Sequence, residues 1–349
     1  MPDLHFIFNP RSVAIVGVSS VTDSLTNRNF LKPLLECGYR GKIYPVNPRL
    51  TEIMGLKVYR SVLEIPGPVD SVVSGLPASL VPRLMRECVE AKVKTVTCFS
   101  AGFSETGESD GIKLERQLAD IARRGRVRLL GPNCLGVHNP AIGYTFEAGG
   151  SRRKGKFGFL SQSGGNTRDL ILAGAQRGVS FSKAVSYGNA ADLDETDFLD
   201  YFARDPETEV VAAYIEGIKR PQSFLPALRE AASSKPVIIL KGGGTEAGTR
   251  AVMSHTSSLA VSGRVWDALC RQTGAMQVAD MAELADAVLA FCYLRPPRGR
   301  RTAVVGIGGG ASVQAADDCE KAGLVVPPFP QHLRRELRAF TTPAGTGIA

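Results

Sequence analysis

One histidine stands where the sequence could carry a phosphoryl group. His255 is flanked by hydroxyl side chains in the run Ser254–Leu259, between a predicted buried strand over 236–241 and a predicted helix over 260–271. Backbone N–H groups at a helix start, together with the positive end of the helix dipole, stabilise a bound anion. The pattern therefore predicts a phosphohistidine placed just ahead of a helix.

A carboxylate at the end of another strand could serve that histidine. Glu216 follows a predicted strand over 210–215. By accepting a hydrogen bond from an imidazole N–H it would fix the tautomer and leave the other ring nitrogen free to attack. Taken alone, such a glutamate is more often a salt-bridge residue on a rim. Its combination with His255 favours a part in the chemistry.

A second anion-binding turn opens the same half of the chain. A predicted strand over 156–160 runs into a hydroxyl- and glycine-rich turn before a helix, made of Ser161, Gln162, Ser163, Gly164 and Gly165. Glycines keep side chains out of the way of a ligand, and serine hydroxyls add hydrogen-bond donors. An N-cap by Ser163 would explain one serine but not the whole run, so we expect a phosphate-binding turn.

In the N-terminal half, small and polar residues follow successive predicted strands. Gly17, Ser19 and Ser20 follow the first strand, and later strand ends carry further candidates: Asn47, Pro48, Pro77, Ser100, Ala101 and Asn133. In a doubly wound sheet such loops gather at one edge and form a crevice. The full G-x-G-x-x-G pattern is absent and the segment 44–49 holds no carboxylate for a ribose. Another nucleotide-bearing ligand is therefore favoured over NAD, with a turn needed only for packing as the alternative.

The remaining reactive side chains suggest no further chemistry. Cys134 lacks a local group that would lower its pKa, so we expect a pocket-lining residue rather than a nucleophile. The acidic run 192–197 is interpreted as the first turn of a helix rather than as a cation site. No HxH or HExxH pattern occurs, and we expect no metal to be held by this chain.

Short β-branched runs alternate with helical patterns, which is typical of βαβ units around a parallel sheet. In the first half the predicted strands cover 13–16, 42–46, 71–75, 95–99 and 126–130, and the helices 27–37, 79–91 and 111–124. In the second half the strands cover 156–160, 183–186, 210–215 and 237–241, and the helices 165–177, 195–202, 222–233, 260–271 and 281–293. A last strand over 302–306 and a helix ending at 322 follow.

These elements predict an α/β protein in three parts. We expect a Rossmann-like domain over 1–140, a flavodoxin-like doubly wound domain over 151–295, and the beginning of a third, incomplete α/β domain over 300–349. The basic runs 152–156 and 295–301 are interpreted as linkers between them. One βα unit cannot bury both its faces, so the last part should need something else to pack against.

Composition narrows the class of partner. The chain has 349 residues, 44% of them hydrophobic, and a net charge of +8, which suits an anionic small ligand. Because no aromatic residues interleave with the basic runs, we expect no nucleic-acid binding. Seven cysteines without a CxxC pair favour a reducing cytoplasm. The most apolar stretch, 282–294, is too short to cross a bilayer, so no membrane association is expected.

Several segments taken together resemble one known family. They are Phe8–Gly17, Gly41–Asn47, Gly131–Gly136, Ser161–Gly164, Tyr214–Gly217 and Ser254–Ala260. In this order, and over nearly the whole chain, they resemble the NDP-forming acyl-CoA synthetases, relatives of the succinyl-CoA synthetase α subunit.

The resemblance implies a function. Acyl-CoA and phosphate would give an acyl phosphate, which phosphorylates His255, steadied by Glu216, with the phosphate held at Ser161–Gly165. The phosphoryl group then passes to ADP or GDP, bound with Mg on an ATP-grasp domain. A partner chain or a missing extension would supply that domain. An oligomer is expected. The coenzyme A site would be lined by Gly17, Ser19, Ser20, Val46, Asn47, Pro48, Pro77, Ser100, Ala101 and Asn133.

The sequence also departs from that family. Ser257 and Val261 stand where the family usually has glycine, Gly165 where it tends to have alanine, and 306–311 replaces a glycine- and proline-containing turn. A less flexible loop at Ser257 could hinder a swing of the histidine. Two other functions therefore stay open: a non-catalytic module that binds coenzyme A or acyl-CoA, and an NAD(P)-dependent oxidoreductase.

Overall fold

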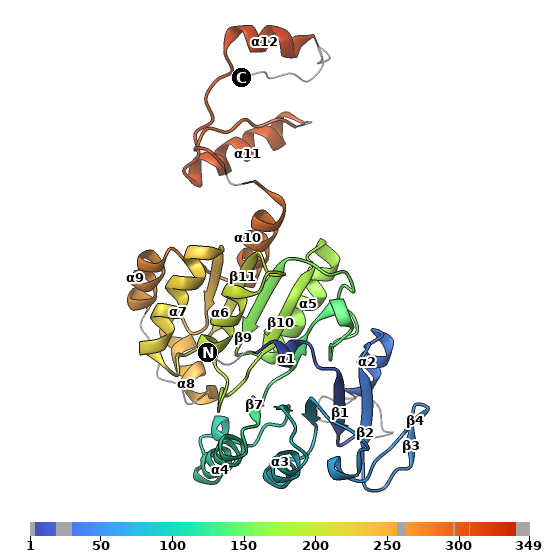
Figure 1. Ribbon diagram of the computed structural model, residues 1–349. Helices are drawn as coiled ribbons and strands as arrows, with labels where there is room; N and C mark the ends of the chain where they lie inside the picture. Colours follow the sequence, from blue (N-terminus) through green and yellow to red (C-terminus); the bar gives the residue numbers. More distant parts are fainter. Residues whose placement is uncertain (1–3, 19–29, 257–262, 296, 307, 340–349) are drawn as a thin grey trace. The chain divides into compact units, whose positions relative to one another are not determined.

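The computed structural model describes residues 4–18, 30–256, 263–295, 297–306 and 308–339, with the backbone alone for 253–256. The chain forms two compact units, 1–294 and 295–349 (Figure 1). Both predicted ligand-binding halves lie in the first unit, which contains two parallel sheets. Among the described residues, no helix is long and apolar enough to cross a membrane.

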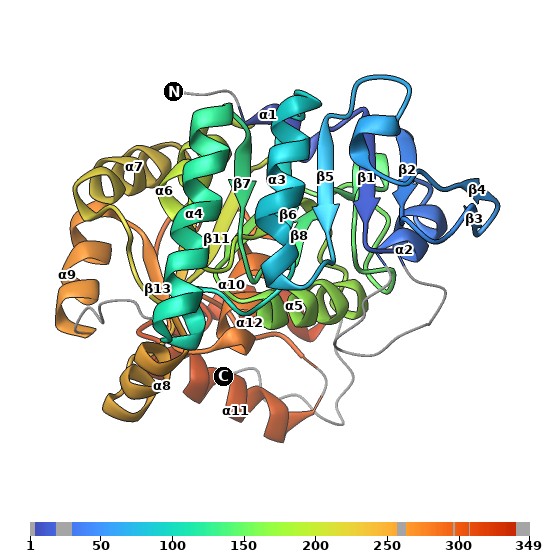
Figure 2. The ribbon, with the colours of Figure 1, turned by 90° about the horizontal axis from the view of Figure 1, so that it is seen from below.

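The first sheet has five parallel strands in the order β2-β1-β5-β6-β7. They are β1 (Ser12–Val16), β2 (Lys42–Val46), β5 (Ser71–Ser74), β6 (Thr95–Cys98) and β7 (Arg128–Leu130). The helices of this half are α1 (His5–Phe8), α2 (Leu31–Glu36), α3 (Val81–Glu90) and α4 (Ser109–Gly125). Figure 2 shows α3 and α4 side by side over the sheet. A small hairpin of β3 (Glu52–Ile53) and β4 (Leu56–Lys57) lies apart from it.

The second sheet has six strands in the order β13-β12-β11-β9-β10-β8. The strands are β8 (Gly136–His138), β9 (Phe157–Ser161), β10 (Phe181–Ser186), β11 (Val210–Ile215), β12 (Val237–Lys241) and β13 (Met276–Val278). The helices are α5 (Gly164–Arg177), α6 (Glu195–Arg204), α7 (Pro221–Ser234), α8 (Glu246–Thr256), α9 (Gly263–Thr273) and α10 (Met281–Tyr293). Only β8 is antiparallel to its neighbour. The predicted α/β class is thus confirmed.

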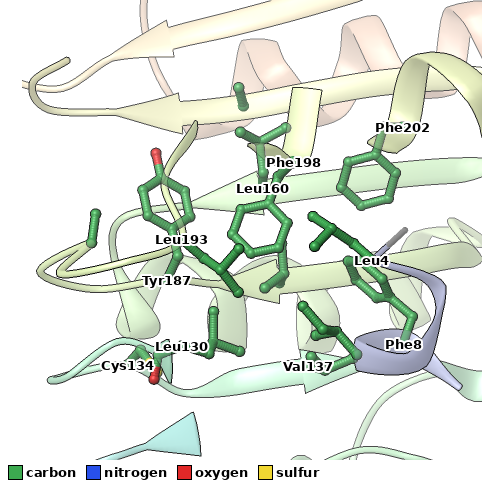
Figure 3. Packing of buried hydrophobic residues seen from close by; sticks show 14 of the residues in the cluster. Leu4, Phe8, Leu130, Cys134, Val137, Leu160, Tyr187, Leu193, Phe198 and Phe202 are labelled. Carbon is green, nitrogen blue, oxygen red and sulfur yellow. The ribbon is translucent and has the colours of Figure 1, made fainter. Parts of the chain in front are cut away.

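Apolar side chains on both faces of the strands hold the second sheet between two helix layers. On one face Phe159 and Ala212 pack with Leu170 of α5, and on the other Leu160 and Ala213 pack with Phe198 of α6. Strands buried on both faces are expected to be apolar throughout, as β9 and β12 largely are. Figure 3 shows that the core on the α6 face continues to Leu130 and Cys134 of the first half.

Main-chain hydrogen bonds join the end of the first sheet to the second. The N–H groups of Asn189, Ala191 and Leu193 donate to the carbonyls of Pro132, Gly131 and Leu129, at 3.0, 3.1 and 3.3 Å. The contact is tight: at Gly188, where φ is +55°, a Cβ atom would lie 2.2 Å from the Pro132 carbonyl oxygen. We call residues 128–133 and 188–193 the seam.

An ion pair closes the seam. The Asp192 carboxylate accepts hydrogen bonds from Arg128 Nε at 2.9 Å and from the Leu129 N–H at 2.8 Å. Both charged side chains are largely shielded, with 23% and 30% of their surface exposed.

Strand β8 links the halves in another way. It lies within the range 1–140 expected for the first domain, yet it pairs with β10 as the edge strand of the second sheet. His138 of this strand is buried, its Nδ1 lies 2.7 Å from Thr145 Oγ1, and burial lowers its pKa to about 4. A neutral histidine of this kind is a packing residue.

The predicted last strand over 302–306 is wrong. That segment contains no strand, and an isolated bridge joins Arg301 to Val325. The unit has two described helices, α11 (Gly309–Lys321) and α12 (Gln331–Arg338), and neither has a buried residue. Val305 is 88% exposed. A lone βα unit has no neighbouring strand to satisfy its backbone groups, which accounts for the missing ladder.

We predict that Asp192→Ala weakens the whole first unit. The buried Leu129 N–H would lose its acceptor, which should lower the free energy of unfolding by about 1–3 kcal/mol. Urea unfolding would measure the loss. Asp120→Ala removes a comparable but exposed pair with Arg123 on α4 and should change stability by about 0.5 kcal/mol or less. Equal effects of the two substitutions would contradict a special role for the seam.

Candidate functional site

Each parallel sheet has one point at which the chain reverses the direction of strand addition. In the first sheet the reversal falls between β1 and β5, and in the second between β9 and β11. Loops at the carboxyl ends of the strands diverge at such a point and leave a crevice where ligands bind in α/β proteins. The candidate residues group around these two reversals.

At the first reversal, main-chain atoms approach closely. Gly17 has φ +90°, and a Cβ there would lie 3.2 Å from the Gly75 carbonyl carbon. Its N–H donates to the carbonyl of Val46 at 3.1 Å, which fixes the loop after β1 against the end of β2. A side chain at Gly17 would therefore leave less room for a ligand to approach the backbone.

The other predicted residues of the first half lie at the same sheet edge. Asn47 Nδ2 donates to the Val18 carbonyl at 2.7 Å, Ser100 Oγ donates to the Leu76 carbonyl, and the Asn133 N–H donates to the Ser100 carbonyl at 3.0 Å. These bonds tie neighbouring loops together at this edge of the sheet. Pro48, Pro77 and Ala101 belong to the same loops, whereas Ser19 and Ser20 lie outside the described residues.

The turn between β9 and α5 is a helix start with its own hydroxyls already engaged. Ser163 is the N-cap and accepts from the Asn166 N–H at 3.2 Å. Ser161 Oγ accepts from the Ser163 N–H at 3.0 Å and donates to the Ser163 carbonyl at 2.8 Å. The two serines therefore shape the turn. Donors for an anion come instead from the first N–H groups of α5, at Gly164 and Gly165, which have no acceptor within the helix.

Gln162 lies in the predicted turn, but its side-chain oxygen contacts another loop of the protein. Its Oε1 accepts hydrogen bonds from the N–H groups of Glu216 and of Gly217, the latter at 2.9 Å. Its own N–H donates to the Tyr214 carbonyl at 3.1 Å. Its oxygen is occupied by the loop after β11, so Gln162 holds the position of Glu216.

Glu216 is buried at the second reversal. Its residue is 5% exposed, and its Oε2 has no hydrogen-bond partner among the described residues. Lys241, at the end of neighbouring β12, is 8% exposed; burial lowers its pKa, and the charge of Glu216 opposes this shift. A buried carboxylate oxygen without a partner among the described residues is suited to accept a hydrogen bond from an imidazole N–H.

The helix predicted after His255 is present as α9 (Gly263–Thr273), but His255 itself belongs to a helix that the sequence analysis did not predict. His255 lies in the last turn of α8, whose first turn is capped by Thr245 Oγ1 accepting from the Gly248 N–H at 3.0 Å. Sequence analysis missed this cap and took the segment for a loop.

Helix α8 packs against a turn of the first half, η3 (Ser104–Thr106). Glu115 of α4 anchors this turn by accepting from Ser104 Oγ at 2.7 Å, and it also accepts from Asn189 Nδ2 at 2.8 Å. The helix that carries His255 thus rests on a turn that follows the Ser100–Ala101 loop. The segment with Ser257 and Val261 lies outside the described residues.

Two other sequence expectations can be placed. Cys134 is 2% exposed and burial raises its pKa well above the usual range, so it is a core residue and not a nucleophile. Most of the acidic run is the start of α6, as predicted: Asp194 and Asp197 form a capping box and both accept from Arg220, whereas Asp192 belongs to the seam. This pairing holds the loop that follows Glu216.

Sequence reasoning missed two side chains near Glu216. They are Tyr214, two residues before it on β11, and Lys241 at the end of β12. The alternation of side chains along β11 could have indicated Tyr214, because residues two apart point to the same face. Lys241 could have been suspected from its place at the end of an otherwise apolar strand.

Comparison with known families and proteins agrees with this arrangement. Residues 11–140 match the model of a CoA binding domain, and residues 154–291 match that of a succinyl-CoA ligase like flavodoxin domain. Together they cover most of the chain.

Two curated relatives illustrate the similarity. The chain is 38% identical over 342 residues to the α subunit of acetate–CoA ligase (ADP-forming) II of Pyrococcus furiosus, covering 97% of this chain and 74% of the relative. It is 39% identical over 337 residues to acetate–CoA ligase (ADP-forming) I of Archaeoglobus fulgidus, covering 96% of this chain and 48% of that protein. The chain therefore spans about half of a longer single-chain relative.

A solved structure shows the same architecture. The dinucleotide forming acetyl-coenzyme A synthetase 1 of Ca. Korarchaeum cryptofilum, in complex with phosphate and ADP, superimposes with a TM-score of 0.88 at 35% identity. The match covers 99% of this chain and 74% of that one. With two domain models matched in order and relatives well above 30% identity along nearly its whole length, this chain belongs to the NDP-forming acyl-CoA synthetases, as a chain of the α type.

Proposed function

We propose that this chain is the α-type component of an acid–thiol ligase that interconverts acyl-CoA, NDP and phosphate with a carboxylic acid, coenzyme A and NTP. One observation carries the proposal: the start of α5 and the buried Glu216, whose Oε2 has no partner among the described residues, meet at the reversal of the second sheet. A phosphate could bind the N–H groups of the helix start, and an imidazole could donate to the carboxylate. The relatives that the chain matches are ligases, which supports this function over the two alternatives.

The proposed chemistry runs in three transfers. A phosphate oxygen attacks the thioester carbon, and the thiolate of coenzyme A leaves and takes a proton, which gives an acyl phosphate. The free imidazole nitrogen of His255 then attacks the phosphorus, and the carboxylate leaves. The phosphoryl group passes last to an NDP. Glu216 accepts the hydrogen bond of the other ring nitrogen and stabilises the cation formed by phosphorylation.

Coenzyme A would bind in the crevice of the first sheet, along Gly17, Val46–Pro48, Pro77, Ser100–Ala101 and Asn133. Hydrogen bonds from main-chain N–H groups and from the Asn47 side-chain amide join these loops. Gly17 has no side chain, so a ligand could reach the backbone there. A phosphate would lie at the N–H groups of Gly164 and Gly165. The family's alanine would fit at Gly165, where a Cβ would meet only Ser163 Oγ, at 3.7 Å.

The nucleotide, with Mg, would bind on an ATP-grasp domain of a partner chain or of a longer polypeptide. The Pyrococcus relative is named as a subunit, and the Archaeoglobus relative is about twice as long as the matched region. An assembly with such a partner remains a prediction. We also propose a cytoplasmic location, since all seven cysteines are free, as is usual in reducing compartments.

We predict that acyl-CoA and radiolabelled phosphate label the full chain at His255. Wild type should retain label after gel filtration, whereas His255→Ala should not, because the attacking nitrogen is lost. His332→Ala, on α12, is the control and should label like wild type. Equal labelling of His255→Ala and wild type would refute the proposed function.

Gln162→Leu should uncouple Glu216 from the turn before α5. Two buried N–H groups would lose their acceptor, so stability should fall by about 1–3 kcal/mol and labelling should slow. Urea unfolding and the labelling rate measure the two effects. The control is Gln222→Leu at an exposed position of α7, which should leave both unchanged. A Gln162→Leu variant with normal labelling would mean that the hydrogen bonds from Glu216 and Gly217 to Gln162 are not needed for the reaction.

Coenzyme A should raise the melting temperature of the protein, and NAD should not. A ligand that binds only the folded state at a hundred times its Kd adds about 2.7 kcal/mol. A thermal-shift titration of both ligands separates a coenzyme A site from a dinucleotide site. A larger shift with NAD would instead favour an oxidoreductase.

A further inference from the structure

Tyr214 and Glu216 meet at a single point of the second sheet. They lie two residues apart at the end of β11, beside Gly242, which follows β12. A Cβ placed on Gly242 would lie 2.6 Å from the Tyr214 hydroxyl oxygen and 2.9 Å from Glu216 Cγ. The phenol and the carboxylate stem therefore lie side by side over the same glycine.

The phenol is neutral and can only donate to a carboxylate. The pKa of Tyr214 is raised to about 12, first by burial and then by the charge of Glu216 and a hydrogen-bond interaction with its side chain; Asn166 has a smaller, opposite effect. Because Tyr214 carries one O–H, a bond to Glu216 uses it fully, and its oxygen is left to accept from Asn166. Asn166 belongs to the first turn of α5, the expected phosphate site.

Glu216 has two oxygens with different surroundings. The Oε2 atom of Glu216 is buried and has no partner among the described residues. The backbone N–H of Glu216, in contrast, donates to Gln162 Oε1. A buried carboxylate with an unrestrained torsion could turn either oxygen outward. A donor on one side removes that freedom.

We propose that Tyr214 is a positioning residue for Glu216. Its hydroxyl donates to one carboxylate oxygen, so that the other faces the imidazole of the phosphorylated histidine. Asn166 extends the same hydrogen-bonded chain to the helix start that binds phosphate. The inference rests on the proposed function for its role in catalysis, but the contact itself does not.

A double-mutant cycle on labelling tests the role. Tyr214→Phe keeps the ring and should slow labelling of the full chain by acetyl-CoA or longer acyl-CoA esters and phosphate about fivefold to tenfold, the loss of one hydrogen bond, with the KM for acyl-CoA unchanged. In a Glu216→Gln background the same substitution should change the rate less than about twofold, because little remains to be positioned. A similar slowing in both backgrounds, or none in either, would overturn the role.

A second cycle tests the contact without any activity. The shifts in melting temperature of Tyr214→Phe and Glu216→Leu should not add in the double variant, since each removes one partner of the same bond. Tyr293→Phe, which removes a hydroxyl bonded to the Gly178 carbonyl at the other end of α5, should be additive with Glu216→Leu. Additive shifts for the Tyr214 pair would overturn the proposal. If wild type fails to label while this cycle is non-additive, the proposed function fails and the contact stands.

Discussion

The seam between residues 128–133 and 188–193 sets the geometry of everything else in the first unit. Its main-chain hydrogen bonds fix the ends of the two sheets against each other, and the Asp192–Arg128 pair reinforces them. The Asn133 loop, expected at the coenzyme A crevice, and the Asn189 loop after β10 are thereby one structure. A ligand that shifts one must shift the other, and η3 and α8 rest on the same contact network.

The second constraint is the burial of charge around Glu216. Glu216 and Lys241 are both buried at the ends of β11 and β12, and the charge of Glu216 opposes the lowering of the Lys241 pKa by burial. Burying charged groups is expensive inside a protein, and a stable apolar core would not need them. Such buried charge is more common at functional sites than in structural cores.

The strands could be predicted from the sequence because their apolar runs are bounded by glycine and proline; β2, β11 and β12 have the expected limits. Strand β8 could not, because three residues at a sheet edge carry no periodicity. The positions of Gln162 and Tyr214 depend on the register between β9 and β11, which no local pattern encodes. For His255, the helix that follows lies close to its predicted range, whereas α8, which contains the histidine, was missed together with its cap at Thr245.

The antiparallel pairing of β8 with β10 also governs how the chain can be divided. A cut at residue 140, where the match to the CoA binding domain ends, would leave β8 with the N-terminal piece. The C-terminal piece would then present the unpaired backbone of β10 as an edge strand open to pairing with other chains. Expressed alone it should aggregate, whereas a piece beginning before Gly136 keeps its own protecting edge.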